Sequence, residues 1–326
     1  MPPIRRSRQK RRTAKKNESN VKLSSAASKA DELEMGESAV VSSANLPQKT
    51  STKTIIKAIQ TWNDQDSPVE GCRKGRYYGW MGRQNKQWYP GLHKFILKTH
   101  IRRKIANPVR IRDQPILARS VDAVTVASRK IKLTRGLRGG KTVDRQVQAF
   151  TEILHRQTDP WVFLLQDPVH WPSALRTKAA RMDIRARAVL RQFRQRGLLP
   201  VGAQVTCGVC ITTPKKEKQR IGTAADVVCF SLDKKLVVIE LKIDSVPWFT
   251  ARQYLMPPLE EFYDTWYTRH QLQLAYTTRM LQKSQFFRSI QLALRRTVTW
   301  KSELWRVAYD VDMYELDERL MHGVLV

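Results

Sequence analysis

Cysteine is scarce in this chain, which has four among its 326 residues. So few cysteines argue against a disulfide framework and favour a reducing, intracellular setting. Long apolar runs are also missing, since no stretch approaches the roughly 18 residues that a membrane-spanning helix needs. The first residues, MPPIRRSRQKRR, lack the apolar region of a secretory signal peptide, so we expect no such signal.

Acidic residues are few as well. The chain has 29 Asp and Glu against 59 Lys and Arg, for a formal net charge of +30. A charge of this size is informative about partners rather than about fold. Nucleic acid is the first candidate, because Lys and Arg that contact phosphates release counterions, and an anionic membrane surface is the second. The stretch RRSRQKRR favours a nuclear localisation signal or a nucleic-acid-binding arm, with a mitochondrial presequence or a plain solubilising tail as alternatives.

Composition divides the chain into three parts. Residues 1–53 contain no aromatic side chain and are rich in Ser, Lys, Arg and Ala, which predicts a disordered tail. Residues 54–136 form a basic extension with a short helix at 54–63, and the stretch YYGWMGRQNKQWYPG interleaves aromatic and basic residues. Such a pattern suits a surface that tracks a nucleic-acid strand, and it suits an ordinary core equally well. Residues 137–326 carry the regular patterns of a folded domain.

The hydrophobic periodicity of that last part changes from helical to extended and back again. Spacings of three and four predict helices, and alternating or continuous apolar runs predict strands. In chain order we expect helices within 141–158 and 173–196, strands at 204–213, 223–232 and 235–243, helices at 258–282 and 284–296, and a closing strand at 303–316. Short connections favour an antiparallel meander for the three central strands. The expected fold class is α+β, an α/β sandwich.

Three charged residues, Asp226, Glu240 and Lys242, interrupt two of the predicted strands. Their stretch reads GTAADVVCFSLDKKLVVIELK, with a turn near residue 233. Burial of an unpaired charge costs several kcal/mol, so such residues are expected to be paired or bound to a metal. Glu240 and Lys242 share one face of their strand, and a hairpin brings Asp226 near them. Two carboxylates suit Mg²⁺ or Mn²⁺, and a surface hairpin with a Glu–Lys pair is the alternative.

This stretch resembles the core motif of the PD-(D/E)xK nuclease superfamily, in which an Asp is followed at a distance by Glu-x-Lys. The resemblance covers roughly residues 137–316 and implies a restriction-endonuclease-like αβββαβ core, with which the predicted order of elements agrees. It implies that Asp226, Glu240 and the backbone carbonyl of Leu241 bind Mg²⁺ or Mn²⁺. Lys242 would then position the attacking water.

The stretch GGKTVDRQVQAF resembles the upstream helix of the exonuclease-like branch of that superfamily, which includes lambda exonuclease and RecB nuclease domains. Gly140 and Asp144 are the matching positions. The resemblance implies that Asp144 or Glu152 adds a further acid to the metal site and that Gln148, on the same helix face, reaches it. A solvated helix surface is the alternative for these side chains.

The stretch HQLQLAYTTRML resembles the downstream Gln-x-x-x-Tyr helix of the same branch. The resemblance implies contacts with nucleic acid for Gln273 and Tyr276, although these residues are three rather than four positions apart. His270, just upstream, is a candidate for a phosphate contact. The alternatives are a solvated Gln273, a core position for Tyr276 and a structural role for His270.

These features together predict a metal-dependent deoxyribonuclease, exonuclease-like, with Mg²⁺ or Mn²⁺ as cofactor, DNA as partner and no membrane partner. RNA is an alternative substrate, and a non-catalytic nucleic-acid-binding protein on a nuclease-like scaffold is an alternative function. No Walker-type loop occurs, so ATP is not implied. Cys207 and Cys210 have no further ligand pair at a matching spacing, and no cysteine follows the Glu-x-Lys motif, so we expect neither zinc nor an iron–sulfur cluster.

Overall fold

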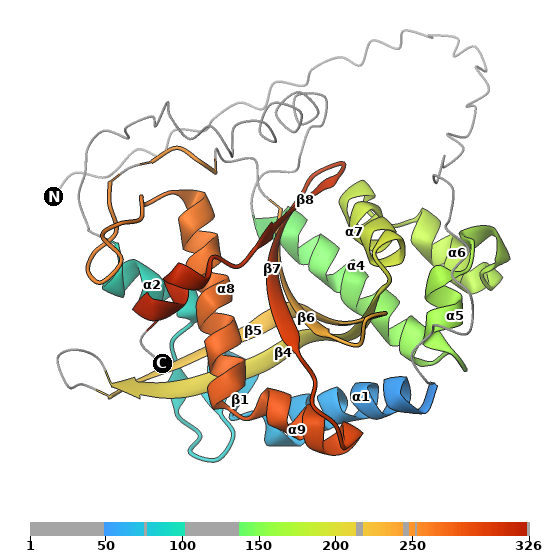
Figure 1. Cartoon of the computed structure of the whole chain (residues 1–326), viewed down its shortest axis with the longest axis horizontal. Helices are drawn as coiled ribbons and strands as arrows, with labels where there is room; N and C mark the ends of the chain where they lie inside the picture. The colour runs from blue at the N-terminus through green and yellow to red at the C-terminus, as the bar shows by residue number, and fades with distance from the viewer. Residues whose placement is uncertain are drawn as a thin grey trace, which may run out of the picture. The chain divides into compact units, whose positions relative to one another are not determined.

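The computed structural model describes residues 49–74, 77–101, 137–212, 218–243, 248–251 and 253–324. The described residues lie within one compact unit, Ala39–Val326. They form a mixed α+β structure in which helices lie on both faces of a five-stranded sheet, which confirms the predicted α+β class (Figure 1). Most of the predicted tail at 1–53 lies outside the described residues, and so do residues 102–136 of the predicted extension.

The sheet contains its strands in the order in which they occur along the chain. They are β4 (Leu198–Thr212), β5 (Lys218–Ser231), β6 (Leu236–Lys242), β7 (Trp300–Val307) and β8 (Val311–Glu315). The pairs β4–β5 and β5–β6 are antiparallel, so the predicted central meander is confirmed. Strand β7 pairs parallel to β6, and β8 returns antiparallel to β7.

The single closing strand predicted at 303–316 is wrong, because β7 and β8 are two strands joined by a tight turn. The turn contains no Gly, Pro or Asn, and the backbone N–H of Ala308 donates to the carbonyl of Asp310 at its centre. Without a Gly, Pro or Asn in the turn, the alternation of apolar side chains continues through it. The sequence pattern therefore merged two short strands into one.

One face of the sheet is covered by helices from the middle of the chain. These are α4 (Leu137–His155), α5 (Pro160–Leu165), α6 (Ser173–Ala180) and α7 (Ile184–Gln195). The single helix predicted at 173–196 is therefore wrong. Asp183 interrupts it as the N-cap of α7, where its carboxylate accepts from the backbone N–H of Arg185 and pairs with that residue's guanidinium. An N-cap of this kind favours a fresh helix start, which apolar spacing alone does not reveal.

The other face is covered by helices from both ends of the described chain. These are α1 (Lys49–Thr61), α2 (Leu92–Thr99), α8 (Trp266–Lys283) and α9 (Phe286–Leu294). The predicted helix at 258–282 begins eight residues later than expected, because the hydroxyl of Thr265 caps α8 by accepting from the N–H of Thr268. In the described part of the chain, no helix is long and apolar enough to cross a membrane.

The described part of the N-terminal extension packs against β4 and β5. It contains α1, the single π-turn η2 (Trp62–Asp66), a small sheet of β1 (Val69–Lys74), β2 (Tyr77–Gly82) and β3 (Trp88–Tyr89), and α2. The Trp62 indole donates to the carbonyl of Thr206 on the edge strand β4 (2.9 Å). Trp62 and Tyr89 are buried, whereas Trp88 is exposed. Within the stretch that interleaves aromatic and basic residues, burial of Tyr89 favours the core interpretation for that side chain.

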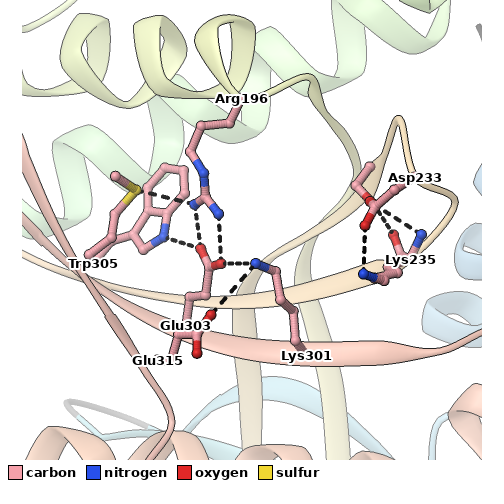
Figure 2. Close-up of polar contacts among 9 residues, drawn as sticks. Arg196, Asp233, Lys235, Lys301, Glu303, Trp305 and Glu315 are labelled. Atoms are coloured by element: carbon pink, nitrogen blue, oxygen red, sulfur yellow. Dashed lines mark hydrogen bonds and ion pairs between the residues drawn. The ribbon is translucent and has the colours of Figure 1, made fainter.

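A buried carboxylate, Glu303 on β7, anchors the contact between the sheet and the end of α7. Its side chain is 2 % exposed. The Arg196 guanidinium binds both of its oxygens (2.6 and 2.8 Å), and the Lys301 ammonium and the Trp305 indole complete its shell at 2.7 and 2.8 Å (Figure 2). Burial by itself would raise the pKa of Glu303, but these donors outweigh burial and lower that pKa to about 2.

Candidate active site

Strands β5 and β6 separate in the middle of the sheet, at the point where the charged residues lie. Their pairing runs from Phe230↔Leu236 to Val227↔Ile239 and ends there. Strand β5 continues its pairing with β4, and β6 continues with β7, so the sheet opens into a fork (Figure 1). Asp226 and Glu240 are the first residues beyond the last pair. The residues predicted as the metal site thus lie at the mouth of this fork.

Asp226 occupies the gap that opens between the two strands. Its Oδ2 accepts from the backbone N–H of Leu241 (2.8 Å), and its Oδ1 accepts from Nε2 of Gln204 on β4 (3.1 Å). The N–H and C=O of one strand residue point toward the same neighbouring strand. Because the Leu241 N–H points toward β5, its carbonyl faces the fork as well. Asp226 and the Leu241 carbonyl therefore face the same opening.

Glu240 is the most deeply buried acid of the fork, with its side chain 1 % exposed. Its Oε1 accepts from Nζ of Lys242 and from Nε2 of Gln273 on α8. Its Oε2 is buried and has no hydrogen-bond partner among the described residues. A buried carboxylate oxygen without a donor is costly, so this atom fits a bound cation. The oxygen donors at the fork are the kind that Mg²⁺ and Mn²⁺ prefer.

The fork concentrates negative charge. Burial, and then the charge of Asp226, raises the pKa of Glu240 to about 8. Burial likewise raises the pKa of Asp226, against the charge of Lys242 and the Leu241 N–H. Burial alone would lower the pKa of Lys242, but Glu240 and Asp226 outweigh it and raise that pKa. One ammonium is thus surrounded by more than one carboxylate, so it cannot neutralise all of their charge. A further cation would compensate the remaining negative charge.

Of the two acids suggested on α4, the structure brings Asp144 to the fork and leaves Glu152 away from it. Burial, and then the charge of Asp226, raises the pKa of Asp144 to about 7 against the opposing charge of Lys242. Glu152 is exposed and accepts from Nε2 of Gln148 (3.1 Å). Gln148 therefore contacts its own helix rather than the fork.

The three residues suggested on α8 have three different placements. Gln273 binds Glu240, so it orients a carboxylate of the site. Tyr276 is fully buried, and its hydroxyl lies 2.7 Å from Nε2 of His100, so a direct contact with nucleic acid does not fit its placement. The His270 ring lies against Trp248, with centroids 5.2 Å apart, and against Trp266 at 6.0 Å. That aromatic packing favours the structural role for His270.

Two residues near the fork were not found from the sequence. Gln204 binds Asp226 from a strand in which no motif singles it out. His93, on α2, has a lowered pKa, which partial burial of its ring and then the charges of Lys242 and Arg269 cause. Both lie far from the Asp226–Lys242 stretch along the chain. Only the folded arrangement of α2, β4 and β5 brings them to it.

Over the described residues, no group of three or more His, Cys, Asp and Glu side chains is arranged to hold a metal ion, so the candidate ligand set is two carboxylates and a carbonyl. Cys207 is buried and Cys210 is exposed, which places the two thiols on opposite faces of β4.

No protein-family model matches the chain, and no curated protein is significantly similar to it in sequence.

Proposed function

We propose that this chain is a divalent-metal-dependent nuclease of the PD-(D/E)xK type that hydrolyses phosphodiester bonds in DNA. The observation that carries the proposal is the fork between β5 and β6, where Asp226, Lys242 and the unpartnered Oε2 of Glu240 converge. The elements α4, β4, β5, β6, α8 and β7 occur in the order of an αβββαβ core, with α5, α6 and α7 inserted before β4 and α9 before β7. That order supports the restriction-endonuclease-like fold as part of the same proposal.

The residues of the fork fit Mg²⁺ or Mn²⁺, which Asp226, Glu240 and the carbonyl of Leu241 would hold. When bound, such an ion supplies Lewis-acid activation of the phosphodiester and stabilises developing charge. The Lys242 side chain keeps 18 % of its surface exposed, whereas that of its partner Glu240 is sealed at 1 %. It can therefore donate to a water that enters the fork. Gln273 and Lys242 together fix one oxygen of Glu240, which leaves the other directed to the metal.

Charge supports nucleic acid as the substrate. The net charge of +30 is large enough to give strong, salt-dependent attraction to a polyanion. Helix α6 and the turn after it present Arg176 and Arg181 to solvent. An exonuclease-like action on DNA inside the cell, with RRSRQKRR as a nuclear address, completes the proposal. The alternative is a nucleic-acid-binding scaffold without catalysis.

Digestion of end-labelled DNA tests the proposal. Linear and closed circular DNA, single- and double-stranded, and a matched RNA would be incubated with Mg²⁺, Mn²⁺ or EDTA. We expect cleavage of linear DNA that requires metal and spares circles. Lys242→Ala is expected to lower the rate by about 10²- to 10⁴-fold, because the group that orients water is gone.

Lys235→Ala is the matched control for that substitution. Lys235 belongs to the same hairpin and pairs with Asp233 at 2.7 Å (Figure 2), and both side chains are about half exposed, at 48 % and 58 %. Its loss should leave cleavage unchanged. Tight DNA binding without cleavage in any metal would favour the scaffold, and preferred cleavage of RNA would correct the substrate.

The acid on α4 is tested by a second pair of variants. Asp144→Asn is expected to reduce metal-dependent cleavage at least about tenfold, because the Asp144 charge reaches Asp226 and Glu240. Glu152→Gln, on the same helix but exposed, should change the rate little. Rates measured over a range of Mn²⁺ concentrations show whether the loss of Asp144 acts through metal affinity. Equal effects of the two substitutions would contradict the placement of Asp144 at the site.

A further inference from the structure

Gln204 has an unusual backbone for a residue inside a long strand. Its φ is 51°, in the left-handed region that residues other than glycine adopt rarely and at a cost. The register of β4 against β5 shifts by one residue just before it, between Pro200 and Gly202. Irregularities of this kind re-aim a side chain, and they persist only where the surrounding structure enforces them.

The N-terminal segment α1–η2 supplies that enforcement on both sides of Gln204. Before it, Gly202 lies so close to α1 that an added Cβ would be 2.7 Å from Cγ2 of Ile59. After it, Thr206 donates its backbone N–H to the Asn63 side chain (3.0 Å) and accepts from the Trp62 indole (2.9 Å). The backbone of β4 is therefore held two residues before and two residues after Gln204.

The side chain of Gln204 is thereby directed at Asp226, and Nε2 donates to Oδ1 at 3.1 Å. The other oxygen accepts from the Leu241 N–H at 2.8 Å. With one donor on each oxygen, the plane of the carboxylate is fixed, and each oxygen keeps lone-pair capacity for a cation. We propose that Gln204 is a positioning residue for the metal site and that the α1–η2 segment holds it in place. This inference rests on the proposed function.

Metal affinity and thermal stability, measured on the full chain, test the inference together. Mn²⁺ binding to EDTA-treated protein would be followed by calorimetry, and Tm by thermal unfolding in EDTA. In Gln204→Gly, we expect the Mn²⁺ affinity to fall about tenfold, as is usual when a group that orients a metal ligand is lost. Its Tm should stay within about 2 °C of the wild type, because glycine accepts the left-handed backbone freely. Gln204→Asn keeps the amide but is too short to reach Asp226, so it should show the same loss of affinity.

Gln285→Gly is the matched control, because Gln285 also has a positive φ, 69°, and lies exposed before α9, away from the fork. It should keep the wild-type Mn²⁺ affinity. Wild-type affinity in both Gln204 variants would overturn the inference, and so would a large fall of Tm in both, which would show a purely structural role. A wild-type protein that binds no Mn²⁺ would instead overturn the proposed function on which the inference rests.

Discussion

Glutamine in place of Glu240 is expected to stabilise the metal-free protein and, at the same time, to abolish cleavage. The Glu240 side chain is buried beside Asp226, and its pKa stands at about 8 instead of the usual 4.5. At neutral pH this carboxyl group therefore binds a proton in the fold that it lacks in the unfolded chain, which costs on the order of 3 kcal/mol, and keeping it charged would cost more. Glutamine removes the charge but also weakens the contact with Lys242, so we expect a net gain in unfolding free energy of about 1–3 kcal/mol.

Thermal unfolding with EDTA and with saturating Mn²⁺ measures this effect. In EDTA, Glu240→Gln should melt several degrees above the wild type. Mn²⁺ at a hundredfold excess over its Kd should stabilise the wild type by about 2.7 kcal/mol, and the variant much less, because a ligand is lost. Cleavage assays on the same preparations should show no activity for Glu240→Gln in any metal.

A lower Tm of Glu240→Gln in EDTA would support the alternative interpretation of the motif, a structural Glu–Lys pair. If Glu240 and Lys242 formed only a structural ion pair, removal of one partner would leave a charge unpaired and lower the Tm in EDTA. Asp233→Asn serves as the control in the same hairpin. It removes an exposed pair with Lys235 at 2.7 Å, and such pairs change the unfolding free energy by less than about 1 kcal/mol.

Much of the fold followed from local periodicity, because the central strands are apolar runs and the helices have one apolar face. The pattern did not resolve places where a single polar contact decides the structure. Asp183 divides the helix predicted at 173–196, and Thr265 sets the start of α8. In both cases one side-chain oxygen caps a helix. Apolar spacing is indifferent to such a contact.

The hairpin carries the part of the candidate site that the residues themselves indicated, and the motif resemblance added Asp144 and Gln273 from other elements. Asp226, Glu240 and Lys242 lie close together in the sequence, so a turn is enough to bring them together. The separation of β5 from β6 has no sequence signal. It arises because β5 continues its pairing with β4 whereas β6 continues its pairing with β7. The supporting residues come from distant elements, as with Gln204 on β4.

Helix periodicity also left choices that only packing resolves. Asp144 and Glu152 lie on one face of the same helix. Glu152, two helical turns further along, is exposed at the surface, whereas Asp144 is partly buried. Gln273 and Tyr276 likewise lie close together on α8. One of them reaches Glu240, whereas the other is covered by α2 through His100 and Phe95. The position of a residue on a helix face indicates in which direction its side chain points, but not which other residues it meets there.

Replacing Glu303 with glutamine is expected to be the most destabilising of the substitutions considered for this chain. Its oxygens accept from Arg196, Lys301 and Trp305, and only 2 % of the side chain is exposed. An amide cannot accept from all of these donors, and its own N–H₂ group would face two cations. Breaking a buried ion pair costs about 3–5 kcal/mol, and the lower end applies here because the Arg196 and Lys301 side chains are 27 % and 37 % exposed. Chemical denaturation at neutral pH should show a loss of about 3 kcal/mol.

Glu315→Gln is the matched control for Glu303→Gln. Glu315 also approaches Lys301, at 4.0 Å, but its side chain is 83 % exposed (Figure 2). Its substitution should change the unfolding free energy by less than about 1 kcal/mol. Equal losses in the two variants would contradict the view that burial and the number of donors give Glu303 its importance.

The dependence of this loss on pH follows from the pKa of Glu303, which is about 2 in the fold against an ordinary 4.5. A carboxyl group whose pKa is lowered by folding stabilises the protein fully above its unfolded pKa, and that stabilisation disappears as pH falls through the folded pKa. The difference in unfolding free energy between the wild type and Glu303→Gln should therefore be constant above about pH 5 and shrink between about pH 4.5 and 2. A difference that stays the same across this range would show that the substitution acts through packing rather than through the charge that Arg196 and Lys301 bind.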